Sequence, residues 1–312
     1  MYIYINPKSI GTSHFEYLKH HFQSINFIVS EEDAHLAEVA VIMPDFFKHH
    51  DINQFHSLKW VQLLMAGYDN FDFSMFVGKD IIVTNAVDVF SVSIAEDVLT
   101  KILVLNRNVK HYVNSMDLGE WNPIRKEPEL TGSTVGIVGA GSIGIEVAKR
   151  VKSFDTKVIG YKRKAVDVPF FDEIYTGNEG LEKVIRESDY LIIAIPLTKE
   201  TMNLINKERI SWMKPSALLI NVARGKVIDQ DALVEALNLG KIRGVGLDVT
   251  TPEPLPKEHP LWKINQVFIT PHNASSSPYM QKRLMDLVIH NLNKYVNNEK
   301  LDYIIFKKCA FF

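Results

Sequence analysis

The sequence contains only one cysteine and no long apolar run, and each of these features excludes several classes of protein. Because Cys309 is alone, the chain can form neither an internal disulfide nor a metal site built from several cysteines, and we expect no metal. No apolar run reaches the roughly 18 residues that a membrane helix needs. The first residues also lack the basic stretch and apolar core of a secretion signal. We therefore predict a cytoplasmic protein that does not bind membranes.

The last four residues, Cys309-Ala310-Phe311-Phe312, formally fit a prenylation pattern. The pattern is loose, and no strong polybasic cluster precedes the cysteine. We therefore interpret Cys309 as a free thiol on a C-terminal tail.

An excess of charge of one sign is also missing. The 35 basic and 37 acidic residues give a formal net charge of −2, so the chain as a whole has no attraction to nucleic acid. Hydrophobic residues at 46% and charged residues at 23% are typical of a globular protein. At about 150 residues per domain, the 312 residues predict two domains.

Short apolar, β-branched runs alternate with helical segments in two successive series. This alternation predicts parallel strands covered by helices. The expected strands of the first series are residues 2–5, 27–29, 39–43, 60–65 and 81–84, with a helix over 14–23. Those of the second series are residues 135–138, 157–161, 191–195, 218–221, 245–248 and 267–270, with a helix over 142–154. The fold class is therefore α/β, with two related, doubly wound sheets.

Two long helices are expected outside these series. Residues 92–114 carry apolar side chains from Ile94 to Leu105 at three- and four-residue spacing, which is the pattern of one helix face. Residues 278–298 form the second helix, which is too long for a tail and is expected to pack on the first domain. Glycine and proline interrupt residues 118–131, so that segment is predicted to be a loop.

A glycine-rich turn follows the first strand of the second series. The glycines are Gly139, Gly141 and Gly144, and Ser142 and Ile143 open the apolar helix that comes next. Only glycine allows so tight a turn and so close an approach of the backbone to a pyrophosphate, whose charge the helix N-terminus stabilises. This strand–turn–helix context predicts a dinucleotide cofactor.

The end of the next strand bears on the choice between NAD and NADP. NAD-binding sites usually carry Asp or Glu there, about 20 residues after the turn, to bind the ribose 2′-hydroxyl. Here the strand runs into Lys162, Arg163 and Lys164 instead. Such cations pair with a 2′-phosphate, so we predict NADP(H) in preference to NAD(H). The alternative is an exposed basic loop that happens to follow a strand.

Three polar residues follow later strands and match what hydride transfer to a keto acid requires. Arg224 can bind a carboxylate through two hydrogen bonds and polarise the carbonyl. His272 can supply a proton near neutral pH, and Glu253 can orient it and favour its protonated form. Each residue alone could be structural or solvated. Together, after a dinucleotide fingerprint, they predict a catalytic site.

At roughly residues 58–290 the sequence resembles the D-isomer-specific 2-hydroxyacid dehydrogenase family. The strongest segments are GAGSIG, PLTKETMNLIN, NVARGKVIDQDAL, GLDVTTPEPLP and ITPHNAS. The resemblance implies that Arg224 and His272 bind substrate, and that Glu253 and His272 form the acid–base pair. It further implies that Asp248 lies near the nicotinamide carboxamide and that Pro196 contacts the cofactor.

Further implications of this resemblance concern the first domain and the architecture. The backbone of Ala66 and Gly67 would bind the substrate carboxylate. Two doubly wound Rossmann-like domains are implied, with the cofactor domain (residues 96–280) inserted into a flavodoxin-like substrate domain (residues 1–95 and 281–312). A homodimer is usual in the family.

The sequence departs from the family pattern in two segments. Residues 84–88 lack the Pro-Gly pair often found after Thr-Asn, so the local substrate loop is expected to differ. Thr250-Thr251 replaces an aromatic-acidic pair. Neither change touches Arg224, Glu253 or His272.

Several activities are compatible with these features. We favour a reductase of small 2-keto acids such as glyoxylate or hydroxypyruvate, because NADPH generally serves reduction. Glu253 argues against formate dehydrogenases, which carry Gln there. A D-lactate- or phosphoglycerate-type dehydrogenase remains an alternative, as does a non-catalytic protein that senses dinucleotides.

Overall fold

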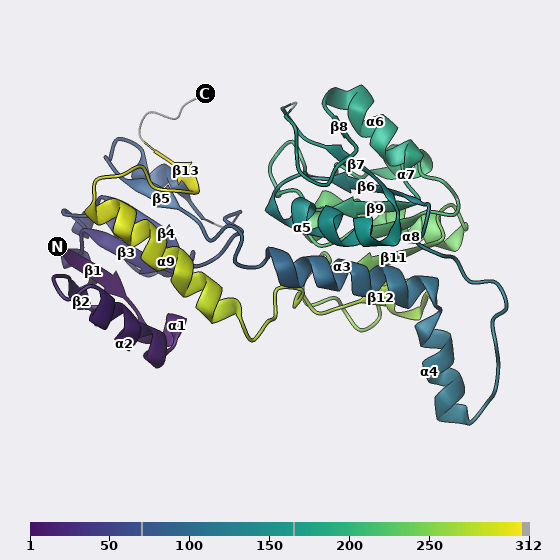
Figure 1. Cartoon of the computed structure of the whole chain (residues 1–312), viewed down its shortest axis with the longest axis horizontal. Helices are drawn as coiled ribbons and strands as arrows, with labels where there is room; N and C mark the ends of the chain where they lie inside the picture. The colour runs from purple at the N-terminus through teal and green to yellow at the C-terminus, as the bar shows by residue number, and fades with distance from the viewer. Residues whose placement is uncertain (70, 165, 308–312) are drawn as a thin grey trace. The chain divides into compact units, whose positions relative to one another are not determined.

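The computed structural model describes residues 1–69, 71–164 and 166–307, so the tail motif that contains Cys309 lies outside the described residues. The chain divides into two compact units (Figure 1). Unit 1 consists of Met1–Phe90 with Ser277–Phe312, and unit 2 is Ser91–Ser276. The sequence places the corresponding boundaries at residues 95 and 280.

Unit 1 is built on a six-stranded sheet in the order β13-β5-β4-β3-β1-β2. Its strands are β1 (Tyr2–Ile5), β2 (Asn26–Ile28), β3 (Val39–Ile42), β4 (Trp60–Leu63), β5 (Ile82–Thr84) and β13 (Ile304–Phe306). All neighbours pair in parallel except β13, which runs antiparallel to β5. The order β2-β1-β3-β4-β5 is that of flavodoxin-like sheets.

Helices and 3₁₀ turns enclose this sheet. They are α1 (Pro7–Ile10), α2 (Thr12–His21), α9 (Met280–Val296), η1 (Ala34–Leu36), η2 (Phe46–Lys48), η3 (Ile52–Gln54) and η4 (Phe73–Phe76). Figure 1 shows α9 lying along the sheet, and its fully buried Asn291 donates a hydrogen bond to Gln62 Oε1 on β4 at 3.0 Å. The last long helix is therefore part of the first folded unit.

Unit 2 has a seven-stranded, all-parallel sheet in the order β12-β11-β10-β9-β6-β7-β8. Its strands are β6 (Thr134–Val138), β7 (Lys157–Tyr161), β8 (Glu173–Tyr175), β9 (Tyr190–Ile193), β10 (Leu218–Asn221), β11 (Gly244–Leu247) and β12 (Val267–Ile269). The chain moves from β6 to β8 on one side and then from β9 to β12 on the other. This is the doubly wound order of dinucleotide-binding domains, with its switch point between β6 and β9.

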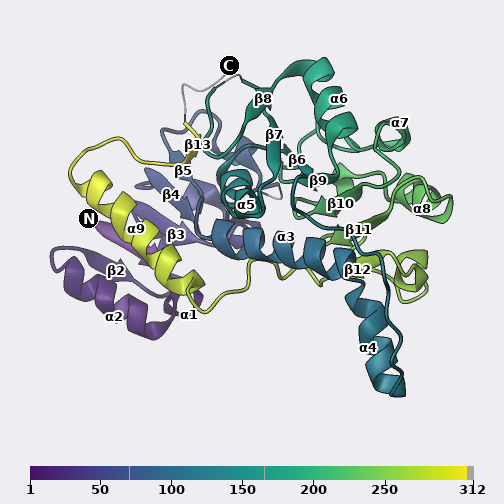
Figure 2. The same cartoon turned by 45° about the vertical axis from the view of Figure 1, so that its right-hand side comes forward.

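Helices cover both faces of the unit 2 sheet, which explains why its central strands are apolar throughout. The helical segments are α3 (Ser91–Asn106), α4 (Val109–Leu118), α5 (Ser142–Val151), η5 (Lys152–Phe154), α6 (Gly177–Glu187), α7 (Lys207–Ser211), η6 (Gly225–Val227), α8 (Gln230–Asn238) and η7 (Pro260–Lys263). In Figure 2, α3 and α5 lie against one face, and they pack on each other. The other face is covered by α6, α7 and α8.

The structure forms two helices where the sequence predicts one. The apolar spacing predicts a single helix over residues 92–114, but α3 ends at Asn106 and α4 begins at Val109. Between them Asn108 adopts the left-handed conformation (φ 48°, ψ 38°), which asparagine tolerates better than most residues. Helical periodicity carries no information on such a backbone break. Strands β8 and β13 and helices α1, α6, α7 and α8 were also not anticipated.

No helix in the described part of the chain is long and apolar enough to cross a membrane.

Candidate active site

Two glycines of the turn after β6 are required by the protein's own backbone. Gly139 has φ 115° and donates from its N–H to Tyr161 O at 3.0 Å, and a Cβ there would lie 2.3 Å from Ala194 O. A Cβ on Gly144 would lie 2.2 Å from Gly139 O. Any side chain at either position would therefore displace main chain.

Gly141 is different, because the fold places nothing near it. Its φ is −97°, which any residue can adopt, and no heavy atom of the described chain lies within 4 Å of an added Cβ. It is the N-cap of α5, whose first turn contains Ser142 and Ile143 and receives no side-chain cap. A helix N-terminus with open space before it and uncapped N–H groups suits a pyrophosphate. The residues present therefore fit a dinucleotide.

The flanking strand ends carry the other residues expected at the cofactor. Lys162, Arg163 and Lys164 follow β7, and the last two are exposed. Pro196 follows β9, and its carbonyl accepts a hydrogen bond from Thr201 Oγ1 at 2.7 Å. In the loop after Pro196, the pKa of Glu200 is lowered. The main cause is hydrogen bonding from Thr198 and the backbone, and the positive charges of Lys199 and Arg163 add to it. The basic residues thus lie at the carboxyl edge of the sheet, beside the glycine turn.

Arg224 is held in a turn after β10 that the Asn221 side chain braces. Asn221 Nδ2 donates to Arg224 O at 3.1 Å, while its Oδ1 accepts from Ala223 N at 3.0 Å. The next residue, Gly225, packs so closely on Thr250 that a Cβ would lie 2.0 Å from Thr250 O. The half-buried Arg224 guanidinium donates to Ala223 O at 2.7 Å.

Glu253 and His272 are directly hydrogen-bonded. His272 Nδ1 lies 2.7 Å from Glu253 Oε2, and Glu253 Oε1 accepts from Thr250 N at 3.0 Å. Both carboxylate oxygens are therefore engaged, which fixes the orientation of the imidazole. With Nδ1 directed to the carboxylate, Nε2 is the nitrogen that can exchange a proton with a bound molecule.

Asp248 fixes the backbone from which His272 projects. The carboxylate is 4% exposed and accepts from Thr270 Oγ1 at 2.7 Å, Asn273 N at 3.0 Å and Ala274 N at 3.2 Å. The Asp248 carbonyl accepts from His272 N at 2.9 Å, where His272 has φ 51°. These bonds keep His272 in a left-handed conformation that a bulky residue rarely adopts.

A buried ion pair lies behind this loop and was missed from the sequence. Lys101 on α3 is fully buried, pairs with Asp97, and donates to Thr270 Oγ1 at 2.7 Å. Burial raises the pKa of Asp97, and the charge of Asp248 adds to this, although the hydrogen bond and charge of Lys101 oppose it. One signal was available, because Lys101 comes three residues after Val98 and so falls on the apolar face of its helix.

In unit 1, Ala66 and Gly67 follow β4 at the carboxyl edge of that sheet. Asn85 Nδ2 donates to Ala66 O at 2.7 Å, and Ala86 N donates to Met65 O at 3.0 Å. The loop after β5 therefore supports the loop after β4.

Comparison with known proteins identifies the family to which the chain belongs. Residues 99–274, more than half of the chain, match the family model of the D-isomer specific 2-hydroxyacid dehydrogenase NAD binding domain. The glyoxylate reductase of Thermofilum pendens is 38% identical over 251 residues, covering 78% of this chain and 73% of that protein. The D-3-phosphoglycerate dehydrogenase of Methanocaldococcus jannaschii is 36% identical over 261 residues, covering 81% of this chain and 48% of that one.

A solved structure extends the likeness to almost the whole chain. The D-isomer specific 2-hydroxyacid dehydrogenase of Xanthobacter autotrophicus, in complex with NADPH and MES, has a TM-score of 0.82 at 26% identity, covering 98% of this chain and 97% of that one. The chain belongs to the D-isomer specific 2-hydroxyacid dehydrogenases. It is therefore an oxidoreductase with a Rossmann-type NAD binding domain.

Proposed function

We propose that this protein uses NADPH to reduce a small 2-keto acid to the D-2-hydroxy acid, with glyoxylate and hydroxypyruvate as the leading substrates. The observation that carries the proposal is the hydrogen bond between His272 and Glu253, at the same sheet edge as Arg224 and the glycine turn. The glyoxylate reductase relative supports the choice of substrate.

In this proposal each residue has a distinct task. Arg224 binds the substrate carboxylate and polarises the keto group. The nicotinamide, when bound, supplies the hydride to C2. His272 donates a proton from Nε2 to the keto oxygen, while Glu253 accepts from Nδ1 and stabilises the imidazolium. The backbone N–H groups of Ala66 and Gly67 are further ligands of the carboxylate.

The cofactor preference rests on the end of β7. Lys162, Arg163 and Lys164 stand where a carboxylate would select NAD(H), and they are proposed to pair with the 2′-phosphate of NADP(H). The NADPH complex of the Xanthobacter relative supports this choice. The other cofactor contacts in the proposal are made by Gly139, Gly141, Ser142, Ile143, Gly144, Pro196 and Asp248.

A substrate panel tests the proposal. The purified chain would be assayed with NADPH and with NADH against glyoxylate, hydroxypyruvate, pyruvate and 3-phosphohydroxypyruvate, and the configuration of the product would be determined. We expect the highest kcat/KM for glyoxylate or hydroxypyruvate with NADPH. If the protein binds NADPH but reduces no keto acid, the proposal fails and dinucleotide sensing becomes the better explanation.

A phosphoglycerate-type activity is the second candidate. The Methanocaldococcus relative favours it, although this chain spans only 48% of that protein. A kcat/KM for 3-phosphohydroxypyruvate above that for glyoxylate would establish it in place of the first proposal.

We further propose a homodimer formed through unit 2. Helix α4 projects from the rest of this unit in Figure 1, and it and the following loop carry exposed apolar side chains. Met116 is 78% exposed, Leu118 71% and Trp121 98%. A cluster of exposed apolar groups of this kind is typical of a protein interface.

The cytoplasmic location stays a prediction.

A further inference from the structure

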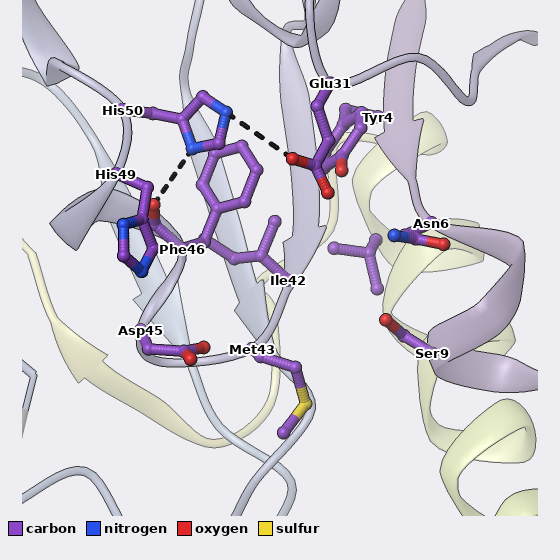
Figure 3. A pocket seen from close by; sticks show the side chains of 11 residues that line it. Tyr4, Asn6, Ser9, Glu31, Ile42, Met43, Asp45, Phe46, His49 and His50 are labelled. Atoms are coloured by element: carbon purple, nitrogen blue, oxygen red, sulfur yellow. Dashed lines mark hydrogen bonds and ion pairs between the residues drawn. The ribbon is translucent and has the colours of Figure 1, made fainter.

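A cavity of about 240 Å³ lies in unit 1 at the carboxyl end of its parallel strands (Figure 3). Segments that follow three neighbouring strands line the cavity. Asn6 follows β1, Glu31 follows β2 and Asp45 follows β3. From β1 the chain moves to β2 on one side and then to β3 on the other. This switch point is where open α/β sheets bind ligands. Neither Ala66 nor Gly67 lines the cavity.

The floor of the cavity contains a buried phenol without a partner. Tyr4 is 1% exposed, and its ring packs against Phe46 with 5.2 Å between ring centroids. No group in the described part of the chain forms a hydrogen bond with the Tyr4 hydroxyl. The hydroxyl oxygen itself is not fully enclosed and is open to the cavity, where a bound molecule can form a hydrogen bond with it.

The charged groups around this phenol are mainly acidic. Glu31 and Asp45 line the cavity, and the described lining contains no lysine or arginine, although Glu31 Oε2 lies 3.9 Å from Nε2 of His50 (Figure 3). The Asp45 side chain does not cap the turn η2 that follows it, so its carboxylate is not engaged there. Burial and the charge of Glu31 raise the pKa of Tyr4 to about 12, so the phenol is protonated at neutral pH. This wall is suited to a cation.

Two further features of the cavity suit an organic cation better than a metal ion. Phe46 stacks on His50, with 4.1 Å between centroids and 7° between planes, and with Tyr4 it offers aromatic faces that attract ammonium or guanidinium groups. Among the described residues, no three His, Cys, Asp or Glu side chains are grouped to hold a metal ion.

The opposite wall suits a second polar group on the ligand. Figure 3 shows Asn6 and Ser9 across the cavity from His49 and His50. Asn6 Oδ1 already accepts a hydrogen bond from Lys8 N at 2.9 Å, and this leaves the amide N–H groups of the side chain to donate to a ligand. A hydroxyl, carbonyl or carboxylate oxygen would satisfy them.

We propose that this cavity binds a small organic amine whose cationic group pairs with Glu31 and Asp45 and donates a hydrogen bond to the Tyr4 hydroxyl. The amine is either a free molecule or the cationic end of a longer 2-keto acid. Only the second source rests on the proposed function.

Binding to the full chain tests the proposal directly. Isothermal titration calorimetry would compare 1,4-diaminobutane and agmatine with 1,4-butanediol and succinate, which match in length but lack the positive charge. We expect the two amines to bind and the diol and succinate not to bind. If no amine binds at millimolar concentration, the proposal is wrong.

Variants locate the binding. Glu31→Gln and Asp45→Asn should each weaken amine binding about threefold to fivefold, and the double variant about tenfold or more. Tyr4→Phe preserves the ring and should weaken binding about threefold. Asp33→Asn is the matched control, because Asp33 is exposed, caps nothing and does not line the cavity. Equal affinity in the double variant and the control would also overturn the proposal.

Kinetics distinguish the two sources of the cation. With NADPH, 5-guanidino-2-oxopentanoate would be compared with 2-oxohexanoate in the wild-type chain and in Glu31→Gln. If the cation belongs to the substrate, KM rises in the variant only for the guanidino acid, and agmatine competes with it. If it is a free amine, the KM values for both acids stay unchanged while calorimetry still detects binding. Amine binding without any keto-acid reduction would disprove the proposed function and leave this site intact.

Discussion

Glu253 accepts a hydrogen bond from Nδ1 of His272 with one carboxylate oxygen, and with the other it accepts from the backbone N–H of Thr250. The imidazole is thereby oriented before any substrate arrives. Replacing His272 by alanine should lower kcat about 10²- to 10⁴-fold, because a positioned general acid contributes that much. Glu253→Gln should retain binding of NADPH but lower kcat by about tenfold or more.

Steady-state kinetics with glyoxylate and NADPH check this prediction. His56→Ala is the control, since His56 is exposed in unit 1 and belongs to no predicted site. If His272→Ala keeps more than about a tenth of the wild-type kcat, another group donates the proton.

The glycines of the turn after β6 should separate into two classes. Gly144→Ala puts a Cβ 2.2 Å from Gly139 O and should lower the free energy of unfolding by about 3 kcal/mol. Gly141→Ala meets no protein atom, so its Tm should be unchanged while NADPH binds about tenfold more weakly. Thermal unfolding and fluorescence titration measure the two effects. An unchanged NADPH affinity in Gly141→Ala would show that the pyrophosphate does not bind at this position.

Arg163 provides a test of cofactor choice. Removing its guanidinium in Arg163→Ala should lower kcat/KM for NADPH about tenfold or more and leave that for NADH nearly constant, because only NADPH carries the 2′-phosphate. The matched control is Lys207→Ala, an exposed cation on α7 that pairs with Glu235. Equal or better rates with NADH in the wild-type chain would show that the basic residues after β7 do not select NADPH.

The ion pair between Lys101 and Asp97 should affect the free energy of unfolding strongly, because it is buried. Lys101→Met leaves Asp97 without its cation and should lower the free energy of unfolding by about 3–5 kcal/mol, whereas Lys101→Met with Asp97→Leu should recover most of the loss. The control is Lys282→Met, which breaks the exposed pair with Asp286 at the same spacing and should change little. Urea unfolding measures all three. Similar losses in both single variants would contradict the prediction.

The same pair makes stability depend on pH. Because the pKa of Asp97 is raised in the native state, its contribution is fully present below about pH 3.8 and is lost as pH rises through the native pKa. The unfolding free energy of the wild type relative to Asp97→Asn should therefore fall as pH increases from about 4. A difference that rises over this range would mean that Asp97 is stabilised as the carboxylate.

The exposed apolar residues after α3 should control oligomeric state. Met116→Glu and Trp121→Glu place charges at residues that are 78% and 98% exposed, so neither should destabilise a single chain. Both should shift a dimer to monomer in sedimentation velocity. Tyr17→Glu, at an exposed position in unit 1, is the control. A wild-type chain that sediments as a monomer would disprove the homodimer.

The carboxyl ends of parallel strands meet at one edge of a sheet, so Arg224, Glu253 and His272 could be predicted to lie at the same edge. The structure joins Glu253 and His272 by a hydrogen bond, while the catalytic role of all three stays a prediction. The position of Lys101 could not be predicted in this way, because its partner Thr270 is distant in the sequence and only packing brings them together. The break at Asn108 was missed because a single left-handed residue leaves no periodic trace.

The cavity in unit 1 was invisible to sequence reasoning for a related reason. Asn6, Glu31 and Asp45 each follow a different strand, and none has a spacing that suggests a site. The unpartnered hydroxyl of Tyr4 can be recognised only when burial and hydrogen bonds are known together.

Helix α9 and strand β13 complete a unit whose other elements come from the first 90 residues. During synthesis, residues 91–276 therefore leave the ribosome as one uninterrupted segment and can fold first, while the sheet edge at β5 and the sheet face at Gln62 on β4 still lack their C-terminal partners. A chain stopped near residue 276 would contain a finished dinucleotide domain attached to an unfinished partner. Its exposed apolar sheet would be a target for chaperones and proteases.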